Sequence, residues 1–226
     1  MTNRLMTSVR RCLLALGAAL LGLLVAMSPA SAAEEAAAAA GQVSAVWKPQ
    51  QINFYMHTIT SVYACRALED KVRQLLLELG ADKGVTVRSV GCYGSELSRS
   101  PYLRIKLASP VEATPQVLAE LEKTRSTREL AARVKGERAD EITGQFPAQW
   151  RKVSLSRGKL GLQEGDCELI DELKRKVLPK LAIRIVKDEV SCMPYSLTMG
   201  QPRLEVEALT QTPQPDTAAS DQANKS

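Results

Sequence analysis

Several residue types and motifs on which enzymes rely are scarce or missing in this sequence. His57 is the only histidine among 226 residues, so metal sites built from several histidines have little support, and no catalytic motif surrounds it. No glycine-rich phosphate loop, Walker motif, Gly-x-Ser-x-Gly or His-Glu-x-x-His occurs. The carboxylates are interleaved with Lys and Arg, a pattern typical of solvated ion pairs on helices. The sequence therefore predicts no metal, no cofactor and no catalytic residues, and it favours a non-enzymatic protein.

Aromatic residues are also few, at 4% of the chain, so the core must consist mainly of Leu, Val and Ile. The sequence has no Cys-x-x-Cys, the arrangement with which common thiol–disulfide enzymes bring two thiols together. Cys65 and Cys167 do begin predicted helices, a position at which a thiol becomes more reactive. A thiol-active enzyme is therefore the alternative to a structural role for the cysteines.

The first 32 residues have the pattern of a secretory signal peptide. Arg4, Arg10 and Arg11 precede an apolar run over 12–27, and residues 30–32, Ala-Ser-Ala, match an Ala-x-Ala cleavage site. The apolar run of about 16 residues is shorter than the roughly 20 that a membrane-spanning helix needs. We therefore expect residues 1–32 to be removed, which leaves no integral membrane span and a periplasmic or secreted protein.

Removal of this leader changes both the cysteine count and the charge. Cys12 is lost, and the even set that an oxidising compartment favours is left: Cys65, Cys92, Cys167 and Cys192. Because the leader carries three Arg and no acid, the formal net charge falls from +5 to +2, which gives no basic footprint for nucleic acid. The expected partner is an envelope protein or polymer whose identity the sequence does not reveal.

Composition divides the rest of the chain into five segments. They are an Ala-rich disordered linker (33–46), a first α/β unit (47–110), a charged helical connector (111–148), a second α/β unit (149–210) and a disordered polar tail (211–226). The mixed charges of the connector usually indicate a solvated helix face. Binding of an anionic polymer through residues 123–138 is the alternative for this segment.

The first unit has the pattern strand, helix, strand, strand. Residues 52–62 are dense in aromatic and β-branched side chains and predict a strand. After Cys65, apolar residues at helical spacing predict a helix that ends at Gly80. Residues 85–90 predict a second strand, and alternation over 103–107 predicts a third.

The second unit repeats this order, which indicates an internal repeat. Asp166 lies at the N-cap position of its helix, just before Cys167, and Glu168 lies in the first turn, where a negative charge complements the helix dipole. Pro179 marks the end of the helix. The strands of this unit are predicted over 150–155, 182–190 and 203–208.

Matched helix and strand lengths favour one pairing of the cysteines. A helix of about 14 residues runs roughly 21 Å, and a strand of about 6 to 8 residues returns a similar distance. The two cysteines of each unit therefore reach the same end, which predicts the pairs Cys65–Cys92 and Cys167–Cys192, 27 and 25 residues apart. We expect an α/β (α+β) fold of two tandem units, each stapled by one disulfide. The units either share a mixed sheet with helices on one face or pack as two subdomains.

Tyr93 and Tyr195 each follow the second cysteine of a unit by a few residues. They are a possible contact surface, but the sequence alone favours their packing over the disulfides.

Three short motifs carry a resemblance: Gly-Asp-Cys-Glu-Leu at 165–169, Leu-Pro at 178–179 and Val-Gly-Cys at 90–92. With them the chain resembles a group of uncharacterised exported proteins of Gram-negative bacteria, which implies no activity. By layout, tandem units of this kind also resemble small periplasmic interaction modules. We therefore expect an exported non-enzymatic binding or envelope-structural protein, and the alternative is a thiol-active envelope enzyme that exchanges disulfides.

Overall fold

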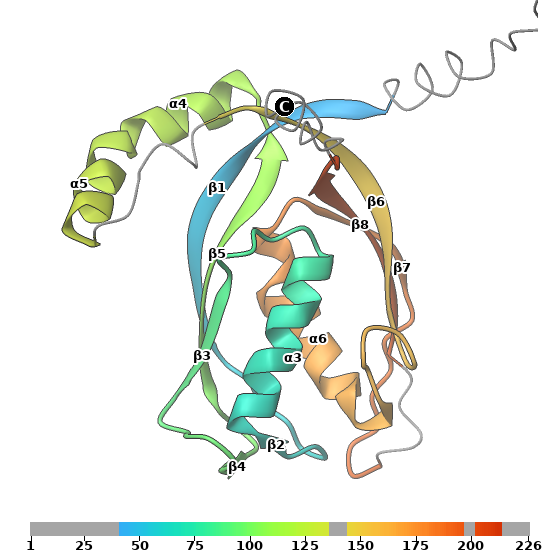
Figure 1. Ribbon diagram of the computed structural model, residues 1–226. Coiled ribbons are helices and arrows are strands. Elements are labelled where there is room, and N and C mark those ends of the chain that lie inside the picture. Colours follow the sequence, from blue (N-terminus) through green and yellow to red (C-terminus); the bar gives the residue numbers. More distant parts are fainter. Residues whose placement is uncertain (1–40, 136–143, 197–201, 214–226) are drawn as a thin grey trace, which may run out of the picture. The chain divides into compact units, whose positions relative to one another are not determined.

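A computed structural model describes residues 41–135, 144–196 and 202–213 (Figure 1). The predicted signal peptide, residues 33–40 of the predicted linker, and residues 214–226 of the predicted tail lie outside this part of the chain.

Six strands form one sheet in the order β3-β5-β1-β6-β8-β7. The strands are β1 (Gln42–Tyr55), β3 (Thr86–Val90), β5 (Tyr102–Glu112), β6 (Phe146–Ser156), β7 (Ile183–Asp188) and β8 (Arg203–Gln211). A second, two-stranded sheet pairs β2 (Tyr63–Ala64) with β4 (Leu97–Ser98). The helices are α3 (Cys65–Glu78), α4 (Pro115–Lys123), α5 (Arg125–Lys135) and α6 (Cys167–Lys176), with short 3-10 turns η2 (Glu164–Asp166) and η3 (Leu178–Lys180) on either side of α6.

The predicted order of strand, helix, strand and strand is confirmed in both units. Unit one contributes β1, α3, β3 and β5, and unit two contributes β6, α6, β7 and β8. In each unit the last strand lies between the other two, and the units meet where β1 pairs with β6. The two units therefore share one sheet, whose strand order is equivalent when read from either edge.

We expected a mixed sheet, but all neighbouring strands of the described chain pair antiparallel. The crossover through α3 does return β3 parallel to β1, but β5 lies between them and runs antiparallel to both. In unit two, β8 separates β6 from β7 in the same way. The alternating pattern of a strand does not encode which neighbour it will have, so the sequence could not reveal this insertion.

Strand β1 begins earlier than predicted. It starts at Gln42, inside the segment expected to be a disordered linker, and ends at Tyr55 rather than near residue 62. It pairs with β5 over residues 45–55 but with β6 only over 42–45. At Pro49 the strand therefore has a neighbour on one side only, where a strand accommodates proline. Beyond this short seam the two halves of the sheet separate, and α3 and α6 lie between them (Figure 1).

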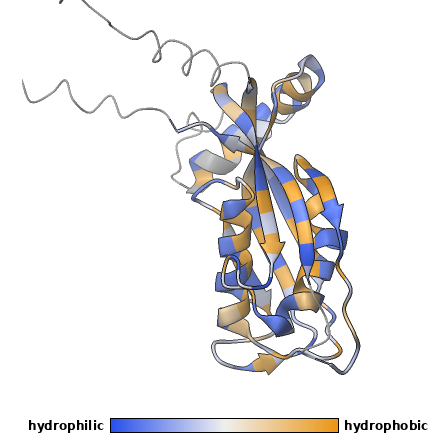
Figure 2. Ribbon diagram, turned by 90° about the vertical axis from the view of Figure 1, so that its right-hand side faces the viewer, coloured by the Kyte–Doolittle hydropathy of each residue, from blue (hydrophilic) through white to orange (hydrophobic). Residues whose placement is uncertain are grey.

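The two helices fill the space between the halves of the sheet with aliphatic side chains. Hydrophilic and hydrophobic residues alternate along the strands (Figure 2), because one face of the sheet meets the helices and the other faces solvent. Side chains of both units belong to one buried cluster, which includes Leu68, Val72 and Leu75 of α3, Leu169, Ile170 and Leu173 of α6, Ile105 of β5 and Val206 of β8. The units therefore have a common core.

Helix α3 ends at the predicted glycine. The N–H of Gly80 donates to the Leu77 carbonyl and that of Ala81 to the Leu76 carbonyl, the pair of bonds that defines a Schellman motif. Gly80 has a φ of +89°, and a Cβ atom there would lie 2.4 Å from the carbonyl oxygen of Leu209 in β8. Both the backbone angle and the close approach require glycine at this contact between the units.

The connector contains helices α4 and α5, and its Arg125 is paired with two glutamates. The hydroxyl of Thr114 accepts a hydrogen bond from the N–H of Val117 at the start of α4. Arg125 lies 3.5 Å from Glu122 and 2.7 Å from Glu129. Residues 136–143 of this segment lie outside the described chain.

One edge of the sheet is irregular. In β7 the register with β8 shifts between Ile185 and Lys187, so that Val186 has no opposite residue. The side chains of Ile185 and Val186 are about half exposed.

We predict that Gly80→Ala destabilises the protein by about 3 kcal/mol or more, because it adds a backbone clash to the strain of a left-handed residue. Gly91→Ala is the matched control: its φ is +78°, but no atom lies within 4 Å of the added carbon. The control should lose only about 1 kcal/mol. Equal losses in urea unfolding would contradict the close contact of Gly80 with β8.

Candidate functional site

Both predicted disulfides are present, Cys65 with Cys92 and Cys167 with Cys192. Cys192 is half-buried and the other three cysteines are buried. The chain-entropy model assigns each bridge roughly 3 to 4 kcal/mol of stability. The Glu96 carboxylate lies within 4.8 Å of the sulfurs of one bridge, but paired sulfurs offer no thiolate to a metal ion.

The two helices begin close together because a buried carboxylate joins them. Asp166, which is 2% exposed, precedes α6. Its Oδ2 accepts from Lys71 Nζ at 2.6 Å and from the Gln163 N–H at 2.8 Å, and its Oδ1 accepts from the Tyr63 hydroxyl at 3.1 Å. Burial, and next the Asp166 charge, raise the pKa of Tyr63, so its hydroxyl stays a donor. Removing one partner of a buried ion pair costs about 3 to 5 kcal/mol.

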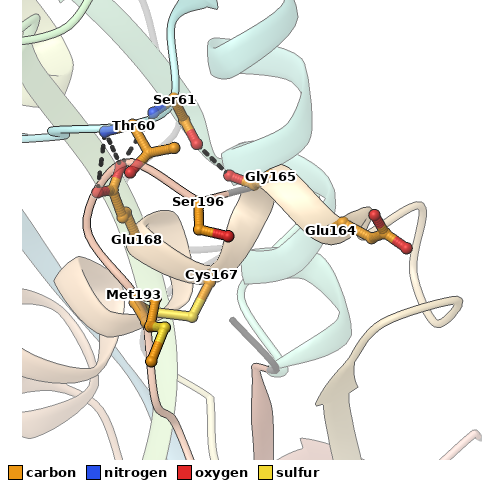
Figure 3. Close-up of a pocket in the computed structure, with 9 residues that line it drawn as sticks. Thr60, Ser61, Glu164, Gly165, Cys167, Glu168, Met193 and Ser196 are labelled. Carbon is orange, nitrogen blue, oxygen red and sulfur yellow. Dashed lines mark hydrogen bonds between the residues drawn. A yellow bond between two sulfur atoms is a disulfide. The ribbon is translucent and has the colours of Figure 1, made fainter. Parts of the chain in front are cut away.

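A second carboxylate fixes the loop that follows β1. Glu168, in the first turn of α6, accepts hydrogen bonds from the backbone N–H groups of Ile59, Thr60 and Ser61, at 3.0 to 3.1 Å. The Ser61 hydroxyl donates to the Gly165 carbonyl (Figure 3). The loop of unit one is therefore held on the helix of unit two by contacts that leave little freedom to its backbone.

Sequence reasoning placed these two carboxylates correctly but gave them local roles. Asp166 does occupy the N-cap position, yet its side chain makes no capping bond to α6. It bonds instead to unit one and to Gln163. The Glu168 carboxylate likewise accepts from a loop more than a hundred residues away in sequence. In the sequence, an acidic residue near a helix start looks the same whether it bonds to its own helix or to a distant segment. Only the tertiary structure therefore identifies the donors.

Two further loops join this region. The Tyr195 N–H donates to the Thr60 hydroxyl at 2.8 Å, and the Arg66 N–H at the start of α3 donates to the Gly94 carbonyl at 3.0 Å. We call the disulfide end the region made of both disulfides, the first turns of α3 and α6, and segments 57–64, 91–101 and 191–196, which include the short strands β2 and β4.

The two tyrosines do not pack over the disulfides, in contrast to the interpretation that the sequence favoured. Tyr93 is 79% and Tyr195 85% exposed. Tyr195 has a φ of +64°, a left-handed conformation that costs a non-glycine residue about 1 to 2 kcal/mol. Large apolar side chains on the same three segments are also exposed: Ile59, Val62, Leu97 and Met193.

The disulfide end offers a surface rather than a pocket. The hollow drawn in Figure 3 has a volume of about 10 Å³ and is lined by Thr60, Glu168, Cys192 and Met193 among others. This volume suits a single water molecule at most.

A larger hollow of about 670 Å³ lies by the C-terminal end of α3. Two charged side chains in its walls, Asp82 and Arg151, already bind backbone groups. Asp82 accepts from the N–H groups of Ala108 and Gly84, and Arg151 donates to the Glu78 carbonyl. These two charged side chains are therefore engaged within the protein and do not orient a small ligand.

No family model matches the chain, and comparisons with curated proteins and with solved structures find no match either. Within the residues that the structure describes, each helix falls short of the length and apolarity that crossing a membrane requires.

The raised pKa of Tyr63 predicts a pH dependence of stability. The folded protein keeps the Tyr63 proton at a pH where the unfolded chain, with an ordinary pKa of about 10, releases it. The contribution of Tyr63 to the free energy of unfolding is therefore complete below pH 10. Above pH 10 it declines by about 1.4 kcal/mol per pH unit. We expect Tyr63→Phe to be about 1 kcal/mol less stable than wild type at pH 8 and to lose this deficit by pH 11.

Urea unfolding at both pH values measures this effect. Tyr93→Phe is the control, since that ring is exposed, and it should match wild type at both. A Tyr63→Phe deficit that stays constant between pH 8 and pH 11 would contradict a buried, protonated Tyr63.

Proposed function

We propose that this chain is an exported, non-enzymatic binding protein of the periplasm or the extracellular space that contacts a partner protein through the disulfide end. Two disulfides suit an oxidising compartment. The proposed export also rests on the signal-peptide pattern of residues 1–32.

The observation that carries this proposal is the conformation of Tyr195. A left-handed tyrosine is costly, yet its ring gains little from burial because it is 85% exposed. Strained residues of this kind are typical of functional sites, where the surrounding structure holds them in place. Here the Thr60 hydroxyl holds the backbone of Tyr195, and Glu168 in turn holds the backbone of Thr60.

The composition of the surface suits a protein partner. Tyrosine and methionine are enriched in the centres of protein interfaces, and the exposed set includes Tyr93, Tyr195 and Met193. The disulfides and the Glu168 contacts fix the loops before binding, which reduces the entropy lost on association. An envelope-structural role would use the same surface.

A thiol-active enzyme is the alternative function. Burial of Cys65, Cys92 and Cys167 argues against it, because a substrate thiol must reach a disulfide sulfur in order to exchange.

We expect no reactive thiol among the four paired cysteines when the native protein, freed of its leader, is treated with a thiol reagent. Cys65→Ala should cost roughly 3 to 4 kcal/mol in urea unfolding, the contribution of its bridge. One or more reactive thiols per native chain, or a Cys65→Ala variant that is as stable as wild type but inactive in disulfide exchange, would favour the enzyme.

Photo-crosslinking in cells that export the protein tests the binding proposal. A photoreactive phenylalanine analogue replaces Tyr93 or Tyr195, and it replaces Lys83 or Lys152 as controls, because both lysines are exposed and lie outside the disulfide end. We expect one common protein adduct from both tyrosine positions and none of it from the lysines. No adduct from either tyrosine, or the same adducts from all four positions, would refute the proposal.

The captured partner allows a quantitative test with the exposed ring of Tyr195. Tyr195→Asn should be as stable as wild type, since Asn tolerates a left-handed backbone, but should bind the partner at least about tenfold more weakly. Tyr195→Phe, which keeps the ring, should stay within about threefold of wild type. Unchanged binding by Tyr195→Asn would place the contact elsewhere.

A further inference from the structure

The outer face of unit one, away from the helices, carries cations. Arg88 of β3 lies directly opposite Arg104 of β5, and Lys106 is two residues further along β5. All three side chains are exposed, whereas the residues between them, such as Leu103 and Ile105, are buried in the core. Like charges directly opposite each other destabilise a sheet, so stability alone gives no reason for this arrangement.

Unit two has the opposite charges at the matching positions. In β8, Leu204 and Val206 are buried as Leu103 and Ile105 are in β5. The intervening residues of β8 are Glu205 and Glu207 where β5 has Arg104 and Lys106.

The acids of β8 are matched by cations of the neighbouring strand. Glu205 lies opposite Lys187 and Glu207 opposite Arg184, both in β7. Each of these acids therefore has a cation directly opposite, whereas Arg104 and Lys106 have no acid opposite them in β1 or β3.

The cations of unit one have few partners within the protein. Arg88 reaches around the edge of the sheet to Glu69 of α3, at 3.6 Å, but its side chain stays 75% exposed. Among the described residues, Arg104 and Lys106 form no ion pair. The connector, which the sequence suggested as an alternative anion site, has its Arg125 paired with two glutamates.

Aromatic rings and amides continue this face along β1. Tyr55 lies opposite Tyr102 of β5, with ring centroids 4.7 Å apart, and His57 stacks beside Tyr55 at 6.2 Å. Gln51 lies opposite Lys106 and Asn53 opposite Arg104. We call the basic face the surface made of Arg88, Arg104, Lys106, Gln51, Asn53, Tyr55 and Tyr102.

We propose that the basic face binds an acidic polysaccharide. Guanidinium and ammonium groups bind carboxylate, phosphate or sulfate groups by charge-assisted hydrogen bonds. The amides supply donors and acceptors for sugar hydroxyls, and the tyrosine rings offer flat faces to sugar rings. A membrane surface fits less well, because interfacial binding uses a continuous apolar face inserted among the lipids. This inference does not depend on the proposed protein partner, which uses a different surface.

The variant that tests this proposal copies into unit one the charges found at the matching positions of unit two. Arg104→Glu/Lys106→Glu reproduces in β5 the charges that β8 already carries and removes the repulsion of Arg88, so the variant should fold. The control is Lys83→Glu/Lys159→Glu, which changes the net charge equally at two exposed residues outside the basic face.

Binding of the full mature protein is measured with polygalacturonate and dextran sulfate as acidic polysaccharides and with unmodified dextran as the neutral one. We expect binding to the acidic polymers alone, weakened by salt. It should fall at least about tenfold in Arg104→Glu/Lys106→Glu and less than about twofold in the control.

Three outcomes would overturn the proposal. They are absence of binding, equal weakening in both double variants, and equal binding of neutral dextran. Vesicles containing phosphatidylglycerol and single-stranded DNA serve as competing polyanions. Preference for either over both acidic polysaccharides would also reject the proposed ligand class.

Discussion

The buried carboxylate of Asp166 is the interaction on which the arrangement of the rest depends. A carboxylate with 2% exposure must be fully bonded, and two of its three donors, Lys71 and Tyr63, come from unit one. The start of α6 is thereby fixed beside the start of α3. Because each helix begins with a cysteine, both disulfides come to the same end of the core. The loops that follow the second cysteines are then brought there too, together with their tyrosines.

Local periodicity was sufficient to predict much of this fold. Apolar spacing after Cys65 and Cys167 gave both helices, Gly80 gave the end of α3, and equal helix and strand lengths gave the cysteine pairing. These features depend on residues near one another in the chain. The start of β1 was missed because Pro49 interrupts the pattern of a strand. The strand tolerates this proline because β1 pairs with β6 only over residues 42–45, which leaves one side of Pro49 without a neighbouring strand. The partners of Asp166 and Glu168 were missed for a related reason, since both are set by contacts between the units.

The two candidate surfaces differ in the physics that would make them work. The disulfide end exposes tyrosine, methionine and aliphatic side chains on segments tied by disulfides, so it would bind by removing that apolar area from water. The basic face is a flat array of charges on a sheet, and its attraction would fall with salt. The two meet at the end of β1, since His57, two residues after Tyr55 and stacked beside it, begins the segment that presents Ile59. A single chain could therefore engage a protein and a polymer side by side.

The irregular register of β7 has a consequence for how chains behave at high local concentration. An open sheet edge with regular spacing is a template on which the strand of another molecule can add. The extra residue at Val186 interrupts the row of backbone donors and acceptors that such an addition would need, and Arg184 and Lys187 flank it with charge. At the opposite edge, Arg88 on β3 adds a cation that would repel a copy of itself. The bulge and the cations therefore oppose edge-to-edge addition of a second sheet, at the same edge where Ile185 and Val186 of β7 are about half exposed.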